Sequence, residues 1–288
     1  MAQKTADINI VRSSTVKGGL GERRRRYNEA KYNKGKIGFQ LGVKRIDNHL
    51  GGLRDEMLII MGVVGVGKTY LALMFTVNIW LEHKVPVVII TNELSDDAIK
   101  GRIDSIVGGF SYSKYRKGKL DESDELTLES LNEIYSDLPE LHVISGAGKS
   151  VAEIEYEMLA IKPAMFMVDG LYLTDMGYND QFKNTMEASR AYQRLIKKHK
   201  LPAILTTQMM EGNQTKYARA IQEDADIVLK LFRSQAMIEE DKMELGFTKI
   251  REEDPNISAW LNWDFVNSNF SETDWESRDE MYEEGYTA

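Results

Sequence analysis

The sequence predicts an α/β fold in which a mainly parallel β-sheet is flanked by helices. Short apolar segments with the length of buried strands alternate with longer helical segments, and parallel strands need such crossovers. The strand-like segments are residues 57–61, 86–91, 141–144, 164–169, 202–207 and 227–232. The chain has 288 residues, 42% hydrophobic and 28% charged, which is typical of one large globular domain with appendages.

A glycine-rich loop lies between the first of these strands and the helix predicted over residues 70–80. It fits the pattern G-x-x-x-x-G-K-[ST], and its residues are Gly62, Val63, Val64, Gly65, Val66, Gly67, Lys68 and Thr69. Such a loop turns backbone N–H groups toward phosphate oxygens, and the following helix adds the positive end of its dipole. We expect residues 62–69, with Tyr70, to bind a nucleotide, with Lys68 on its phosphates and the Thr69 hydroxyl on Mg²⁺.

Composition excludes several other classes of protein. Cysteine is absent, so disulfides, thiol nucleophiles and cysteine zinc sites are ruled out. The four histidines are scattered and form no metal-ligand spacing. No apolar run has the length of a membrane span, and the first residues do not resemble a signal peptide. We therefore expect a cytoplasmic protein with no membrane partner.

The two ends of the chain carry opposite charge. Residues 1–45 hold twelve Lys/Arg and three Asp/Glu, whereas residues 271–288 hold one Arg and seven Asp/Glu. We interpret residues 1–36 as a basic arm with a short helix near 22–33, and residues 267–288 as an acidic disordered tail. The arm is either solvated or a contact to nucleic acid phosphates. The tail is either solubilising or a partner-binding segment.

Polar residues follow three of the predicted strands directly. Glu93 comes after the second strand, Asp169 ends the fourth and Gln208 ends the fifth. In a parallel sheet these positions share the carboxyl edge, where ligands bind. An acidic residue at a strand end typically supports Mg²⁺ in an NTPase, so Asp169 is a candidate metal residue beside Thr69.

Helices, loops and a hairpin complete the prediction. Ser95 is the expected N-cap of a helix, and residues 185–199 form an amphipathic helix. Residues 174–184 and 209–220 are expected to be loops. The segments 243–250 and 258–265 alternate around a polar turn at 252–256, which predicts an antiparallel hairpin.

Over residues 37–266 the chain resembles a RecA-like P-loop NTPase and, more narrowly, the C-terminal motor domain of DnaB-family replicative DNA helicases, including bacteriophage versions. The resemblance rests on an ordered set of segments. These are Gly51-Gly52-Leu53, the phosphate loop, Asn92-Glu93-Leu94-Ser95, Val168-Asp169-Gly170-Leu171, the strand ending at Gln208, Glu223-Asp224-Ala225-Asp226 and Lys249-Ile250-Arg251.

The resemblance implies ATP as the substrate and a role for each matching residue. Glu93 takes the position of the catalytic glutamate that polarises water, and Gln208 that of the γ-phosphate sensor. Lys68 neutralises phosphate charge, while Thr69 and Asp169 support Mg²⁺. Lys249 and Arg251 take the positions of the Lys-x-Arg pair that reaches the nucleotide of the neighbouring subunit.

The same resemblance implies partners and leaves alternatives open. As partners it implies single-stranded DNA, further copies of the chain in a hexamer, and a separate loader and primase. The candidate DNA-binding residues are Lys183, Lys216, Tyr217 and Arg219. Two features depart from the family. We expect its N-terminal domain to be missing, because only the basic arm precedes the motor, and the loop after Gln208 is short. A RecA-like recombination or annealing ATPase that forms filaments on single-stranded DNA therefore stays open, as does a DNA-independent regulatory ring ATPase.

Overall fold

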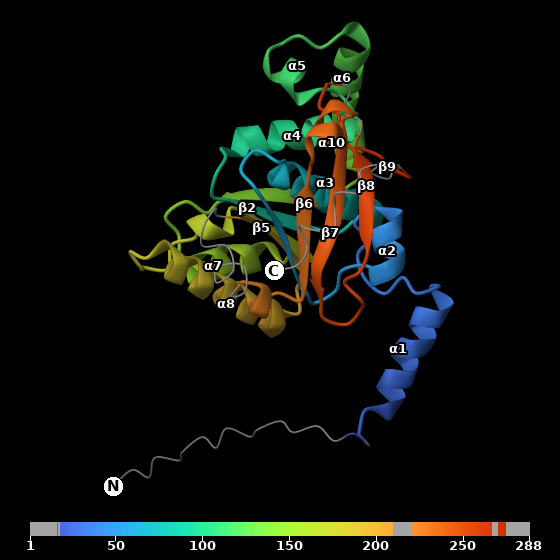
Figure 1. The fold of residues 1–288 in the computed structure, drawn as a ribbon, viewed down its shortest axis with the longest axis vertical. Helices are drawn as coiled ribbons and strands as arrows, with labels where there is room; N and C mark the ends of the chain where they lie inside the picture. Colours follow the sequence, from blue (N-terminus) through green and yellow to red (C-terminus); the bar gives the residue numbers. More distant parts are fainter. Residues whose placement is uncertain (1–15, 17, 210–220, 267–269, 275–288) are drawn as a thin grey trace.

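A computed structural model describes residues 16, 18–209, 221–266 and 270–274. Its centre is a nine-stranded sheet with the order β3-β2-β4-β5-β1-β6-β7-β8-β9 (Figure 1). Neighbours from β3 to β6 are parallel, and the last three strands are added antiparallel. The strands are β1 (Met57–Gly62), β2 (Val87–Thr91), β3 (Leu141–Ser145), β4 (Met165–Asp169), β5 (Ala203–Gln208), β6 (Ile227–Phe232), β7 (Lys242–Ile250), β8 (Ser258–Asn262) and β9 (Glu272–Thr273). The predicted α/β fold with a C-terminal hairpin is confirmed.

The central strands are buried on both faces, and successive side chains alternate between two cores. Leu58 and Ile60 of β1 belong to the core beneath α2, α3 and α4. Met57 and Ile59 belong to the opposite core, beneath α7 and α8 (Figure 1). Because both faces are covered, these strands are continuous apolar runs rather than alternating ones. The helices are α2 (Lys44–Leu50), α3 (Lys68–His83), α4 (Asp96–Gly108), α5 (Tyr112–Arg116), α6 (Glu122–Ser136), α7 (Val151–Ile161), α8 (Gln181–His199) and α10 (Gln235–Glu239), with a 3₁₀ turn η1 (Leu171–Leu173).

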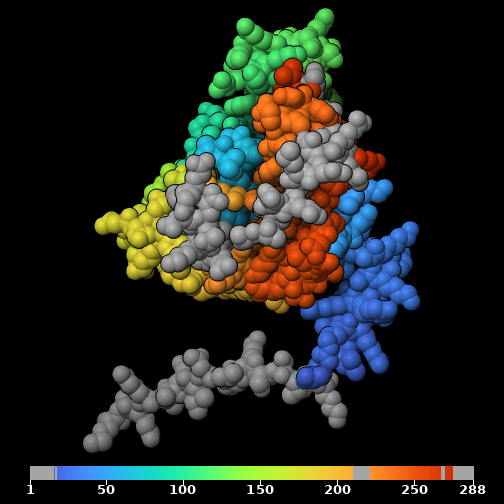
Figure 2. Space-filling model, viewed as in Figure 1, coloured from blue at the N-terminus to red at the C-terminus, as the bar shows by residue number. Residues whose placement is uncertain are grey.

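Helix α1 (Leu20–Tyr32) has no buried residue and projects from the body of the molecule (Figures 1 and 2). It carries the four-arginine run, and Arg25 pairs with Glu22 and Glu29 on the same helix. The helix predicted near residues 22–33 is therefore present. Because it buries nothing, its support comes from such local pairs, which are weak at an exposed surface.

The structure corrects three boundaries of the prediction. Helix α8 begins at Gln181, inside the predicted loop 174–184, because the Asp180 side chain accepts from the Lys183 backbone N–H and caps it. Strand β8 ends at Asn262 rather than at 265, because the next residues turn inward to pack on α3. Strand β9 lies in the range 267–288, for which the sequence predicted a disordered tail.

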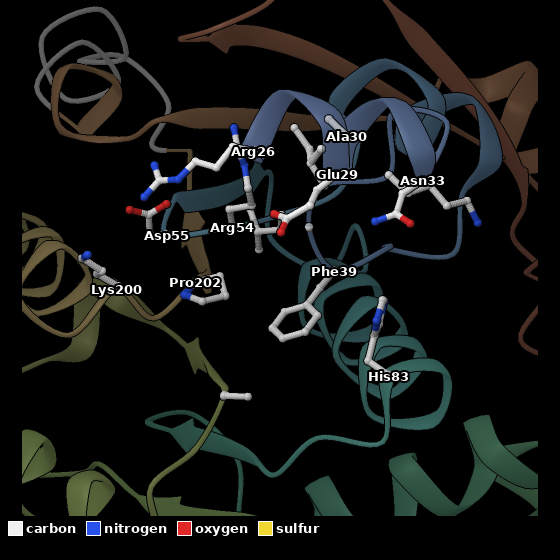
Figure 3. Close-up of a pocket in the computed structure, with 15 residues that line it drawn as sticks. Arg26, Glu29, Ala30, Asn33, Phe39, Arg54, Asp55, His83, Lys200 and Pro202 are labelled. Carbon is white, nitrogen blue, oxygen red and sulfur yellow. The ribbon is translucent and has the colours of Figure 1, made fainter. Parts of the chain in front are cut away.

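A cavity of about 650 Å³ lies between α1 and the body (Figure 3). Arg26 and Glu29 of α1 line it together with Arg54, and Phe39 and His83 line it from the core domain. It also borders Ala164 and Pro202, which directly precede β4 and β5. The cavity is therefore at the amino-terminal edge of the sheet, opposite the phosphate loop. Within the described part of the chain, no helix combines the length and apolarity needed to cross a bilayer.

Candidate nucleotide-binding site

The phosphate loop joins the end of β1 to the start of α3 and depends on two glycines with positive φ. Gly65 has φ +77° and Gly67 has φ +107°, conformations that favour glycine. A Cβ at Gly67 would also lie 2.7 Å from the ring of Trp263, which directly follows β8 and packs against the loop. Val63 and Val64 are exposed at the tip. The loop is thus packed against Trp263 at its base and exposed to solvent at its tip.

Lys68, the first residue of α3, folds back into the loop. Its Nζ donates to the Val63 carbonyl over 2.9 Å, and the residue is only 8% exposed. Burial lowers the pKa of the Lys68 amine, while Glu93 and Asp169 act in the opposite direction. A bound phosphate would place further negative charge beside this amine and so stabilise its charged form against burial.

Thr69, Asp169 and Thr206 form a buried polar cluster beside the loop. The Asp169 Oδ1 atom accepts from the Thr69 hydroxyl over 2.7 Å and from the Thr206 hydroxyl over 2.9 Å. Burial raises the pKa of the fully buried Asp169 carboxyl, which these two hydrogen bonds oppose. Its second oxygen, Oδ2, has no hydrogen-bond partner among the described residues.

This cluster suits a hard divalent cation. Mg²⁺ is commonly held by one or two protein oxygens together with phosphate oxygens and water. The Thr69 hydroxyl donates its hydrogen to Asp169 and keeps its oxygen lone pairs for a ligand. The unpartnered Asp169 oxygen lies in the same cluster, so the donor set is chemically appropriate for Mg²⁺.

A cavity of about 380 Å³ opens beside the loop and brings several predicted residues together. Lys68, Thr69, Glu93 and Gln208 all line it. Gln208 Nε2 also donates to the Tyr172 hydroxyl at 2.5 Å, and the neighbouring Glu93 carboxylate helps to raise the pKa of that phenol. Three separate strand ends therefore converge on one site, as expected from the parallel sheet.

The cavity also has a wall that the sequence did not predict. Arg102 of α4, Tyr112 and Ser113 of α5, and Phe265 complete its lining. The Arg102 guanidinium lies over the Tyr112 ring at 5.5 Å. None of these residues belongs to a recognisable motif, and the packing of α5 and of the segment after β8 places them here. In the sequence, only Arg102 could have indicated this wall, because it is a basic residue among the buried positions of a helix with an N-cap.

Lys249 and Arg251 lie at the other edge of the sheet. Lys249 is the second-to-last residue of β7, and Arg251 directly follows the strand. Because β7 runs antiparallel to β6, Ile250 pairs with Ile227 at the start of β6. The Arg251 Nη1 atom lies 3.1 Å from Asp226 Oδ1, and Lys249 Nζ donates to the backbone carbonyls of Gln222 and Glu223. These two residues therefore do not line the nucleotide cavity of their own chain.

Among the predicted DNA-binding residues, Lys183 lies in the described part of the chain and does not line the nucleotide cavity. Lys183 lies in the first turn of α8, with its Nζ 4.2 Å from the centroid of the Tyr178 ring. Lys216, Tyr217 and Arg219 lie outside the described residues.

The fold and the phosphate-loop site together define a RecA-like P-loop NTPase domain. The chain belongs to the DnaB-like helicase C-terminal domain family, whose model matches residues 38–262. This confirms the resemblance to DnaB-family replicative helicases.

Individual relatives are distant. The chain is 24% identical over 214 residues to the replicative DNA helicase DnaB of Treponema pallidum, covering 69% of this chain and 49% of the relative. It is 25% identical over 227 residues to the replicative DNA helicase DnaB of Leifsonia xyli subsp. xyli, covering 73% and 49%. The chain thus spans about half the length of the curated relatives it matches.

Two solved structures share the fold. One is an isolated ATPase domain, which superposes with a TM-score of 0.77 at 19% identity and covers 90% of this chain and 98% of that domain. The other is a DnaB-like replicative helicase, described with its interactions with primase, which gives a TM-score of 0.76 at 18% identity and covers 90% and 67%.

Proposed function

We propose that this chain is the motor of an ATP-dependent replicative DNA helicase that translocates on single-stranded DNA. The observation that carries the proposal is the convergence of Lys68, Thr69, Glu93 and Gln208 on one cavity in a member of the DnaB-like family. Such a motor works in the cytoplasm, in the host cytoplasm if a bacteriophage encodes it.

Each residue of the cavity has a role in phosphoryl transfer. Lys68 binds the β- and γ-phosphates, residues 62–70 enclose them, and Gln208 contacts the γ-phosphate. Glu93 orients and polarises the attacking water. Thr69 and Asp169 would hold Mg²⁺, which when bound neutralises charge on the phosphate oxygens. Catalysis by positioning and charge stabilisation of this kind is the general pattern for phosphoryl transfer.

Arg251 and Lys249 act on the nucleotide of an adjacent subunit. Neither side chain lines the nucleotide cavity of its own chain, which supports a role at the cavity of a neighbouring subunit. An arginine supplied from outside is worth roughly 10³–10⁵ in rate. A hexamer satisfies this geometry, and a separate loader and primase would act on the assembled ring.

The test is ATP-driven unwinding of a forked DNA duplex by the unmodified protein and by Lys68→Ala and Arg251→Ala. Both variants are expected to lose unwinding and ATP hydrolysis while keeping their fold by circular dichroism. Arg116→Ala is the matched control, since it removes an exposed arginine from α5. Its activity should equal that of the unmodified protein.

Mixing the two inactive variants tests action across subunits. Interfaces that pair an intact Lys68 with an intact Arg251 should recover ATP hydrolysis, whereas no recovery would contradict the trans role of Arg251. Hydrolysis that single-stranded DNA accelerates without any unwinding, together with filaments in electron micrographs, would favour a recombination or annealing ATPase. Hydrolysis indifferent to DNA would favour a regulatory ring ATPase.

A further inference from the structure

Tyr172 joins two residues of the nucleotide cavity that come from different strands. It lies in the 3₁₀ turn η1, directly after β4. Its hydroxyl accepts from Gln208 Nε2 at 2.5 Å, and the nearby Glu93 carboxylate helps to raise the pKa of the phenol. Glu93 packs against the same turn, since a Cβ at Gly170 would lie 3.2 Å from its Oε1 atom. The phenol thus bonds the end of β5 and lies near Glu93, which follows β2.

Chemistry fixes which group donates at this contact. The Gln208 amide nitrogen can only donate, and an ionised carboxylate can only accept. The Tyr172 hydroxyl therefore accepts from Gln208 and keeps its own hydrogen to donate to the Glu93 carboxylate. Burial and the neighbouring Glu93 raise the pKa of the Tyr172 phenol, so the hydroxyl keeps the proton that it donates.

The turn that carries Tyr172 is held in place from both sides. Leu171 is fully buried in the core beneath α7 and α8. The Tyr172 backbone carbonyl accepts from the side chain of Gln181, at the start of α8, over 2.5 Å. The Gly170 N–H donates to the Thr206 hydroxyl, which itself donates to Asp169. The backbone that carries the Tyr172 phenol is therefore fixed in position.

We propose that Tyr172 is a positioning residue that couples Gln208 to Glu93. The inference rests on the proposed function, in which these two residues sense the γ-phosphate and polarise water. The Gln208 amide nitrogen has two N–H groups, and one of them suffices for Tyr172. The other is available to a phosphate oxygen, so a movement of Gln208 toward the phosphate pulls on Tyr172 and reorients the Glu93 carboxylate.

The first test is Tyr172→Phe, which removes the hydroxyl and keeps the ring. We expect kcat for ATP hydrolysis to fall roughly ten- to hundredfold, since a small misplacement of a catalytic group costs about this much. KM and the affinity for a fluorescent ATP analogue should stay within about twofold, because the phenol does not line the phosphate loop. Tyr156→Phe is the matched control, because it removes an exposed hydroxyl from α7 and should change nothing.

A double-mutant cycle with Gln208→Ala tests the coupling itself. If Gln208 acts on Glu93 through Tyr172, the double variant is no slower than the slower single variant. Independent action would instead multiply the two losses and would overturn the coupling. An unchanged kcat in Tyr172→Phe, or an equal loss of kcat and nucleotide affinity, would overturn the positioning role.

Glu93→Gln separates this inference from the proposed function. The variant should lose ATP hydrolysis whatever Tyr172 does. If Glu93→Gln stays active, the proposed role of Glu93 fails. If Glu93→Gln is inactive while Tyr172→Phe equals the unmodified protein, only the inference about Tyr172 fails.

Discussion

Replacing Asp226 by asparagine tests how Arg251 is held at the edge of the sheet. Asp226 is 2% exposed and its carboxylate has three partners. Oδ2 accepts from the Met57 backbone N–H over 3.0 Å and lies 3.2 Å from Lys197 Nζ, while Oδ1 lies 3.1 Å from Arg251 Nη1. Asparagine keeps the shape and removes the charge, so the change addresses the two ion pairs.

The magnitude follows from the exposure of the partners. The Lys197 and Arg251 side chains are 45% and 43% exposed, so each ion pair is worth at most about 1 kcal/mol. The asparagine oxygen can still accept from Met57, whose N–H is therefore satisfied. We expect Asp226→Asn to lower the free energy of unfolding by about 1–2 kcal/mol. Asp226→Ala also leaves the buried Met57 N–H without an acceptor, which adds about 1–3 kcal/mol.

Urea denaturation measures the free-energy losses of Asp226→Asn and Asp226→Ala, provided that the dependence of the unfolding free energy on urea concentration is unchanged. The single variants Arg251→Ala and Lys197→Ala serve as controls, and each should lose less than about 1 kcal/mol. Two results would refute the reasoning. One is a loss for Arg251→Ala as large as that for Asp226→Ala. The other is equal stability of Asp226→Asn and the unmodified protein.

Three further predictions concern packing, pH and helix capping. Trp263→Ala should lower the free energy of unfolding by about 3–5 kcal/mol, because it leaves a cavity in a buried site beside the phosphate loop. Calorimetry measures this loss. The variant should also bind a nucleotide analogue more weakly. Hydrogen bonds from Lys198 and then His199 lower the pKa of the Glu155 carboxyl, so its stabilisation is present above the ordinary glutamate range and is lost as pH falls through the lowered pKa. Glu155→Gln should thus cost up to about 1 kcal/mol at pH 7 and nothing in strong acid, and a cost that persists in acid would contradict the assignment. Ser150→Ala should cost about 1 kcal/mol in a denaturant titration, because Ser150 caps α7, whereas Ser150→Asp should cost little.

The sequence predicted the central strands well because their burial on both faces leaves continuous apolar runs. It also predicted which polar residues meet, because a parallel sheet gathers the strand ends at one edge. Glu93, Asp169 and Gln208 lie where this rule puts them, and the Ser95 cap of α4 is confirmed. The roles of these residues stay predictions until the variants are measured.

What the sequence did not predict depends on contacts between distant segments. Tyr172 has no periodicity that distinguishes it, and its partner Gln208 comes from β5, more than thirty residues later in the chain. Phe265 approaches Tyr70 only because the chain turns inward after β8, giving ring centroids 5.0 Å apart. The start of α8 was missed because the Asp180 cap lies in a polar stretch that also suits a loop. Propensity and spacing describe neighbours along the chain, whereas these features arise from tertiary packing.

The two-residue strand β9 protects one border of the sheet. Without it, β8 would present its unpaired N–H and C=O groups to solvent, and such an edge is a template for aggregation between chains. Glu272 of β9 also accepts from the backbone N–H groups of Lys44 and Arg45 at 2.9 and 3.0 Å, and so caps α2, whose own N-cap residue Val43 has no side-chain acceptor. Shortened versions of this protein for crystallisation should therefore retain residues 270–274. Removing them would expose the edge of β8 to aggregation and would leave α2, more than two hundred residues earlier in the chain, without its N-terminal cap.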